Sequence, residues 1–335
     1  MKGTVLLAHG SGGILSRELI KNVFVSALNN KYLAELDDSA IIELEGTRLA
    51  LTTDSYVVRP LFFPGGTIGT LAIAGTINDL AVMGARPVAL TCGVIIEEGF
   101  SIAVLEDIAA QMAVVARDAG IPVVTGDTKV VEKGKADGVY ITTAGTGIVS
   151  SKFSLGMNRI TVGDVLIVSG NLGDHALAVL SAREDLGLKG GIESDCAPLH
   201  GLVMSLEECG RYIKFMRDLT RGGLAGVVSE IIEDRAFGLQ ISESSIPLGE
   251  ATRNACELLG LDALYLANEG KILLVVEGQH ADKIVGLLRK HPLGCEARIV
   301  GEVVPGPPGK AYLVTTIGTR RVLEPPFDDQ LPRIC

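Results

Sequence analysis

Hydrophobic and polar residues change their spacing several times along the first 150 residues of the chain. Residues 40–44 and 48–53 have the length and pattern of strands, and the turn-forming pair Glu45 and Gly46 separates them, which predicts a β-hairpin. Beyond this hairpin the pattern predicts, in chain order, a helix over 67–83, a strand over 87–95, a helix over 101–119 and strands over 122–125 and 139–149. The first half is therefore predicted to form a ββαβαβ unit.

The second half of the chain also alternates between helical and strand spacing. Its predicted strands are 164–169, 264–266, 271–276 and 297–304, and its predicted helices are 174–184, 199–210, 224–235 and 280–290. A break rich in proline and glycine follows at residues 305–309, and then a strand-like run over 311–316. Beyond it, the last residues of the chain carry too many prolines for a helix and are predicted to form an extended arm.

A length of 335 residues is about twice that of a usual domain, so two α/β (α+β) domains are expected. The predicted organisation is a glycine-rich flap and leading helix (1–36), an N-terminal domain (37–150), a C-terminal domain (151–305) and a flexible tail (306–335). The net charge of −10, without any basic run, disfavours nucleic acid and anionic membranes as partners. The apolar runs are too short to span a bilayer or to act as a secretion signal, so the cytoplasm is the expected location.

The cysteines are scattered without the spacing of a metal site. They are Cys92, Cys196, Cys209, Cys256, Cys295 and Cys335. Most are predicted to be small apolar core residues. Cys335 differs because it lies on a polar, proline-containing tail, where burial has no obvious purpose and the thiol is sterically open.

Four acidic residues stand at the ends of predicted elements or in turns: Asp54, Asp79, Asp127 and Asp218. Any one of them alone is more typical of a solvated turn, but Mg²⁺ on a nucleotide is held by one or two carboxylates together with phosphate oxygens, and four such acids favour that site. Lys129 follows Asp127 within one turn and is suited to phosphate. The chain has neither a Walker P-loop motif nor a Rossmann fingerprint, so an ATP site must be of another kind.

Two further segments could carry chemistry. Residues 9–13, HGSGG, could wrap phosphates with backbone N–H groups, or they could form a flexible leader. Glu269 interrupts a strand-like run, which is compatible with a general base or with a solvated β-bulge.

Taken together, four motifs resemble the PurM-like ATP-binding family. They are INDLAVMGARP (77–87), GDTKVV (126–131), RDLTRGG (217–223) and ANEGK (267–271). Within that family, AHGSGG (8–13), TTDSYVVRPLFFPGGTIG (52–69) and the terminal PRIC (332–335) resemble the HypE hydrogenase maturation factors from end to end. A selenophosphate synthetase would be expected to carry a reactive cysteine in the N-terminal flap, whereas the first cysteine here is Cys92.

The resemblance implies an ATP-dependent carbamoyl dehydratase, a carbon–oxygen lyase. A carbamoyltransferase, HypF, would place a carbamoyl group on Cys335, and ATP would phosphorylate the amide oxygen. Loss of phosphate would leave a thiocyanate, and the cyanide would pass to the iron of a [NiFe]-hydrogenase precursor through the HypC–HypD complex. The expected cofactors are therefore ATP and Mg²⁺.

The resemblance also implies the roles of individual residues. Cys335 would carry the substrate, Glu269 would abstract a proton, and Lys129 would face phosphate or developing charge. The implied metal or phosphate ligands are Asp54, Asp79 and Asp127, and the other implied nucleotide contacts are His9, Gly10, Gly12, Gly13, Asp218, Arg221, Gly222, Gly223 and Asn268.

The resemblance implies a homodimer, in which the N-terminal sheets pair into a barrel and ATP lies between the two domains. Apolar first-half strands such as 89–96 agree with a sheet covered on both faces. Two alternatives stay open: another PurM-like ATP-dependent ligase or small-molecule kinase in which Cys335 is incidental, and a nucleotide-binding scaffold without turnover. Loss of activity on removal of the tail would exclude the first, and phosphate release would exclude the second.

Overall fold

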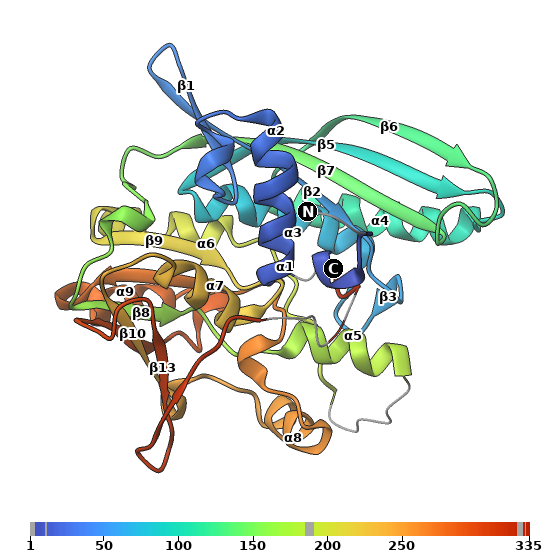
Figure 1. Ribbon diagram of the computed structural model, residues 1–335. Coiled ribbons are helices and arrows are strands. Elements are labelled where there is room, and N and C mark those ends of the chain that lie inside the picture. The colour runs from blue at the N-terminus through green and yellow to red at the C-terminus, as the bar shows by residue number, and fades with distance from the viewer. Residues whose placement is uncertain (1–3, 11, 185–190, 327–330, 332) are drawn as a thin grey trace.

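The computed structural model describes residues 4–10, 12–184, 191–326, 331 and 333–335 (Figure 1). Ser11 of the HGSGG motif, Pro332 of the terminal motif and residues 327–330 of the predicted arm lie outside this described part. Within the described part, each helix is too short or too polar to cross a membrane.

The first domain is built on a five-stranded sheet with the order β1-β2-β7-β5-β6. Its strands are β1 (Ala40–Leu44), β2 (Thr47–Tyr56), β5 (Ala85–Glu97), β6 (Val123–Val131) and β7 (Val139–Val149). The predicted hairpin is confirmed, since β1 and β2 pair antiparallel around a turn in which Glu45 and Gly46 both have positive φ. All five strands predicted for this half are present, one more than the ββαβαβ notation counts, and the last of them, β7, lies between β2 and β5.

Helix α3 (Ile68–Val82) is the central element of the molecule. A capping box of Thr67 and Thr70 begins it, and nearly all of its residues are buried. It packs on β2, β5 and β7 on one side and on elements of the second domain on the other, which explains why its sequence is apolar on every face. Helix α4 (Ile102–Ala119) lies beside α3, and the short hairpin of β3 (Phe62–Phe63) and β4 (Gly66–Thr67) precedes α3.

The second domain is built on a seven-stranded sheet with the order β14-β13-β10-β12-β8-β11-β9. Its strands are β8 (Asp164–Val168), β9 (Ile213–Asp218), β10 (Gly238–Ser242), β11 (Ile272–Glu277), β12 (Arg298–Val304), β13 (Ala311–Val314) and β14 (Arg320–Val322). Its helices are α5 (Asp174–Glu184), α6 (His200–Met204), α7 (Gly223–Ile232), α8 (Glu250–Leu259) and α9 (Ala281–Leu288). Two apolar clusters fill this domain, and each contains buried residues of β8, β9 and β11.

Three sequence predictions differ from the structure in this domain. Residues 264–266 were predicted as a strand, but a 3₁₀ turn occupies Ala263–Tyr265, begun by the Asp262 side chain accepting from the Leu264 amide. The predicted helix over 199–210 is split into α6 and a 3₁₀ segment (Glu207–Tyr212). Strands β13 and β14 lie within the predicted tail, because β13 pairs with β10. The chain stays on the second domain as far as Glu324, because the Leu323 amide donates to the Ala311 carbonyl and the Tyr265 hydroxyl donates to the Glu324 carbonyl, each at 2.9 Å.

The N-terminal segment is helical from residue 14 to residue 28: α1 (Ile14–Leu19), a π-helical stretch (Ile20–Val25) and α2 (Ser26–Leu28) form one rod (blue in Figure 1). This rod lies against the second domain. Arg17 and Lys21 both form ion pairs with Glu233, at 2.5 and 2.9 Å. The predicted leading helix is thus docked on the second domain.

Candidate functional site

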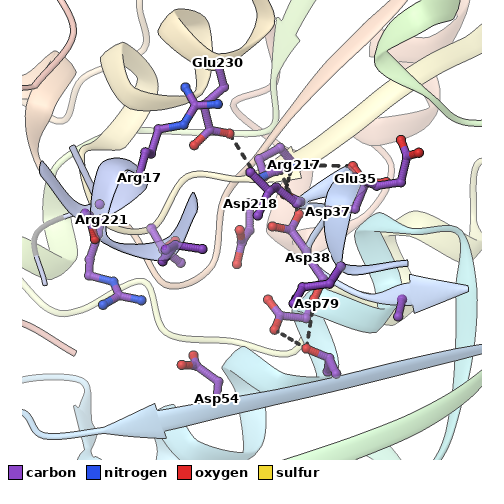
Figure 2. A pocket seen from close by; sticks show the side chains of 18 of the residues that line it. Arg17, Glu35, Asp37, Asp38, Asp54, Asp79, Arg217, Asp218, Arg221 and Glu230 are labelled. Atoms are coloured by element: carbon purple, nitrogen blue, oxygen red, sulfur yellow. Dashed lines mark hydrogen bonds and ion pairs between the residues drawn. The ribbon is translucent and has the colours of Figure 1, made fainter. Parts of the chain in front are cut away.

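A cavity of about 1220 Å³ lies between the N-terminal rod, the first sheet and the second domain (Figure 2). Of the residues predicted from sequence, seven line it: Gly12, Asp54, Asp79, Asp218, Arg221, Glu269 and Cys335. They come from six separate stretches of chain, and the volume is large enough for a nucleotide. The fold therefore gathers most of the predicted chemistry at one place.

Three carboxylates meet at one side of this cavity. Asp38 precedes β1, Asp79 lies in the last turn of α3, and Asp218 ends β9; one oxygen of each lies within 4.8 Å of the others. Asp54 projects from β2 toward the same space (Figure 2). Mg²⁺ prefers such hard oxygen ligands, so this donor set fits the ion.

Burial and mutual repulsion perturb these acids. Burial raises the pKa of Asp79 well above its ordinary value, and the charges of Asp218 and Asp38 raise it further. Burial likewise raises the pKa of Asp218 to about 6, although Arg217 opposes the shift. Carboxylates that repel one another in a closed space favour a bound cation, because the cation lowers the cost of ionising all of them.

Arg217 partly offsets this negative charge from behind the cluster. Its guanidinium lies 3.1 Å from Asp38, 3.0 Å from Glu230 and 3.7 Å from Asp37. The surrounding acids raise its pKa although burial opposes the shift. Arg217 is held by these three ion pairs and links Asp37 and Asp38 to Glu230.

The glycine motif of the N-terminal segment lies against the RDLTRGG loop. The Arg221 guanidinium donates to the Gly10 carbonyl at 3.0 Å. Gly12 has a φ of +78°, and a Cβ there would stand 2.9 Å from the Arg221 Cβ, so only glycine fits without a shift. Gly12 lines the cavity, whereas the structure does not bring His9, Gly10 or Gly13 to its wall.

His9 stabilises its own segment. Its Nδ1 accepts from the Leu6 amide at 2.9 Å, and its carbonyl accepts from the Ser16 hydroxyl at 2.8 Å.

Gly222 and Gly223 have positive φ and begin α7, where a Cβ on Gly223 would stand 2.5 Å from the Leu266 carbonyl. These glycines allow a tight turn directly after Arg221, which lines the cavity.

Glu269 is buried on the cavity wall. Its Oε1 has no hydrogen-bond partner in the described part of the chain. Burial raises its pKa well above the ordinary value, and the charges of Asp218 and Asp54 add to the rise. A carboxylate with a raised pKa is a stronger base at neutral pH than an ordinary one.

The neighbouring Asn268 has another role. Its amide is fully buried; it accepts from the Gly173 amide at 2.8 Å and donates to the carbonyls of Leu219 and Leu266. Its polar atoms are therefore engaged by backbone from three segments, and the structure does not present it to the cavity. Asn268 fixes the loop that carries Glu269.

The end of the chain is docked inward. The Val57 amide donates to the Cys335 carbonyl and the Arg59 amide to the Arg333 carbonyl, each at 3.3 Å. The Arg333 guanidinium donates to the Val57 carbonyl at 3.1 Å and pairs with Asp137 at 2.5 Å. Figure 1 shows the C-terminus beside the first domain, and Cys335 lines the cavity.

Asp127 and Lys129 lie elsewhere. Both are exposed on β6, the outer strand of the first sheet, and pair with each other at 2.8 Å. Lys129 lowers the pKa of Asp127. The structure of one chain therefore does not bring these two predicted residues to the cavity.

Sequence reasoning missed Asp38 and the counter-ion Arg217. The pair Asp37 and Asp38 directly precedes the first predicted strand, and Arg217 opens the RDLTRGG motif, so both stand next to segments already singled out. Neither could be assigned, because only the folded chain brings Arg217 of β9 within 3.1 Å of Asp38, which precedes β1.

Family models agree with this two-domain layout. The model described as AIR synthase related protein, N-terminal domain, matches residues 36–149, and the model for the C-terminal domain matches residues 161–314. Together with the two sheets and the cavity between them, these matches define a protein of the PurM-like class.

More specific relatives match the whole chain. Carbamoyl dehydratase HypE of Escherichia coli is 47% identical over 336 residues, covering 99% of both chains, and that of Azotobacter vinelandii is 46% identical over 333 residues, covering 99% of this chain and 98% of the relative. The chain belongs to the HypE family of carbamoyl dehydratases. Among solved structures, E. coli HypE matches with a TM-score of 0.83 at 48% identity, covering 95% of this chain and 100% of that chain.

Two further structures of the family carry informative descriptions. One is a HypE–HypF complex (TM-score 0.87, 44% identity, covering 92% of this chain and 99% of that chain), and the other is HypE in complex with ATP (0.83, 41%, 99% and 100%). A thiamine monophosphate kinase from Aquifex aeolicus matches at 16% identity and a TM-score of 0.65, covering 92% of this chain and 99% of that chain, which shows a shared fold alone. The chain therefore acts in hydrogenase maturation with its family.

Proposed function

We propose that this protein dehydrates a carbamoyl group carried on Cys335, using ATP, and so supplies cyanide for the iron of [NiFe]-hydrogenase. The observation that carries the proposal is that Cys335, Glu269 and the carboxylate cluster line one cavity. A thiol tail, a base and a metal-phosphate site are the three components that such a reaction needs. The ATP complex of a 41% identical relative supports the nucleotide.

The reaction balances as follows. The thiocarboxamide oxygen attacks the γ-phosphorus of ATP, and ADP leaves. The C–O bond then breaks with release of phosphate, while the two nitrogen protons are removed, leaving S–C≡N on Cys335. Phosphate is a far better leaving group than an amide oxygen, which explains the need for ATP.

The residues of the cavity divide this work. Asp38, Asp79, Asp218 and Asp54 would hold Mg²⁺ against the phosphates, and the ion would neutralise charge on the transferred group. Arg221 lines the same space, where its positive charge favours anions. Glu269, with its raised pKa and unpaired oxygen, is placed to take a nitrogen proton.

Asp127 and Lys129 would act through a homodimer. Residues 122–130 are exposed, and β6 forms a long outer edge with apolar residues Val123, Val124 and Val130 at the surface. An open edge of this kind presents unpaired backbone groups, which are a template for pairing with a strand of another chain. Pairing of two first-domain sheets would cover it and would carry Asp127 and Lys129 toward a second subunit.

The transferase HypF is the proposed donor of the carbamoyl group, and HypC–HypD is the proposed acceptor of the cyanide. The complex of a 44% identical HypE with HypF supports the first assignment. For transfer, Cys335 would have to leave its inward position, so the arm is proposed to alternate between two positions.

Intact mass spectrometry tests the proposal. With HypF, carbamoyl phosphate and ATP·Mg²⁺, the protein is expected to gain about 43 Da and then to settle at a gain of about 25 Da as the thiol becomes a thiocyanate. Cys335→Ala should gain neither. A wild-type protein that releases phosphate without any mass change at Cys335 would contradict the proposal and favour another ATP-dependent activity.

A further inference from the structure

The connection between α5 and α6 contains residues 193–197, which have no regular structure yet contact three parts of the molecule. The Ser194 amide donates to the Pro64 carbonyl of the first domain at 2.8 Å. The Ala197 carbonyl accepts from Asn78 of α3 at 3.1 Å. We refer to residues 193–197 as the strap.

The strap fixes the backbone that carries the proposed base. Asp195 accepts from the Glu269 amide at 3.0 Å with one oxygen, and from the Gly270 amide at 3.3 Å and the Lys271 ammonium at 3.0 Å with the other. Burial opposes ionisation of Asp195, but Lys271 and the Glu269 amide hold the pKa of this carboxyl below its ordinary value. Asp195 therefore remains an anion and holds this loop by charge-assisted hydrogen bonds.

The same strap reaches the tail through His175 of α5. The His175 ring is fully buried; its Nδ1 lies 2.8 Å from the Ser194 hydroxyl and its Nε2 lies 2.8 Å from the Ile334 carbonyl. A carbonyl can only accept, so Nε2 carries the proton. Burial lowers the pKa of His175, so the ring is neutral and its Nδ1 accepts from Ser194.

This arrangement is unusual for a core histidine. The ring lies in an apolar environment, edge-on to Phe63 at 5.4 Å between centroids, and a buried polar group there needs hydrogen-bond partners. One of its partners is the carbonyl adjacent to the reactive cysteine, on a segment that has to leave during transfer. A purely structural histidine would be expected to take its partner from a permanent part of the core.

We propose that His175 and Ser194 are positioning residues, which set the place of Cys335 relative to Glu269 by holding the Ile334 carbonyl. A continuous series of contacts supports it: tail carbonyl, His175, Ser194, then Asp195 and the Glu269 amide. The catalytic consequence rests on the proposed function, whereas the docking of the tail does not.

Tail docking is tested by alkylation of Cys335, without nucleotide or carbamoyl donor. In His175→Phe, which keeps a ring but loses both nitrogens, iodoacetamide should label Cys335 about five- to tenfold faster than in the wild type. His175→Gln, whose amide can donate to the same carbonyl, should restore protection to within about twofold. Cys295, which is exposed, serves as the internal standard. His280→Phe is the matched control, because His280 is a half-buried histidine of the second domain that stacks on Tyr212 and makes no contact with the tail among those described.

Ser194→Ala provides a second variant should the ring replacement disturb folding, and it should accelerate labelling by a smaller factor. Unchanged labelling of Cys335 in both His175→Phe and Ser194→Ala would overturn the proposal. Faster labelling of Cys295 as well would show general loosening and would also overturn it.

The catalytic part is tested by single turnover of pre-carbamoylated protein. His175→Phe should lower the rate of cyanation at saturating ATP while ATP affinity stays within about twofold of the wild type. A normal single-turnover rate despite fast labelling would overturn the positioning role. If the wild type itself shows no cyanation, the proposed function fails, and the labelling result still decides whether His175 docks the tail.

Discussion

Replacing Asp218 by Asn should stabilise the metal-free protein at neutral pH. Folding raises the pKa of this carboxyl from 3.8 to about 6, so the folded state holds its proton more tightly than the unfolded state does. Below about pH 3.8 both states are protonated and nothing is lost. As the pH rises, the unfolded state ionises first and the cost to folding grows until the pH passes about 6.

The size of the effect follows from the two pKa values. At pH 7.5 the ionisable Asp218 opposes folding by about 3 kcal/mol, and at pH 4.5 by about 1 kcal/mol. An asparagine cannot ionise and keeps nearly the same shape, so it removes this cost. The free energy of unfolding of Asp218→Asn should therefore exceed that of the wild type by about 3 kcal/mol at pH 7.5 and by about 1 kcal/mol at pH 4.5.

Urea unfolding followed by circular dichroism, in EDTA at both pH values, measures this difference. Asp127→Asn is the matched control: its carboxylate is exposed and paired with Lys129, so the change should stay within about 0.5 kcal/mol. Mg²⁺ should then stabilise the wild type more than Asp218→Asn. A gain that is equal at pH 4.5 and 7.5, or a loss of stability at pH 7.5, would refute the electrostatic account of the cluster.

Three further changes probe other parts of the molecule. Glu269→Gln should slow cyanation by about 10² or more with ATP affinity unchanged, measured by single turnover; a normal rate would remove Glu269 as the base. Val130→Glu on the outer strand should convert dimer to monomer in analytical ultracentrifugation, whereas Leu258→Glu, equally exposed on α8, should not. Gly12→Ala should weaken ATP binding about tenfold in calorimetry, because its Cβ would press on Arg221; unchanged affinity would show that the loop gives way freely.

The local pattern of the sequence was sufficient for much of the first domain. The hairpin was predicted because its turn residues and strand lengths are local features. The position of β7 between β2 and β5 was not, because strand order depends on packing of segments far apart in the chain. Likewise β13 was recognised as a strand but placed in the tail, since only its pairing with β10 shows where it belongs.

The candidate site shows the same difference between what local sequence predicts and what packing decides. Asp54, Asp79 and Asp218 were predicted as separate turn acids, and the fold brings them to one cavity; Asp38 became visible only through its distance to two of them. Asn268 stands beside Glu269 in one motif, yet its side-chain amide forms hydrogen bonds with backbone groups and does not face the cavity. A motif locates a segment, but the direction of each side chain is decided by what packs around it.

The ion pairs of Arg217 bear on how a nucleotide could enter and leave the cavity. Its partners Asp37 and Asp38 precede the first sheet, whereas Glu230 belongs to α7 of the second domain. The nearly buried Arg217 side chain therefore links the two walls of the cavity by ion pairs. Separating the two walls would break these ion pairs and leave buried charges without their partners, at a cost of several kcal/mol. The N-terminal rod is held by Arg17 and Lys21 in partly exposed pairs, which are weak. We therefore expect the two walls of the cavity to keep their spacing, and nucleotide to exchange by movement of the N-terminal rod.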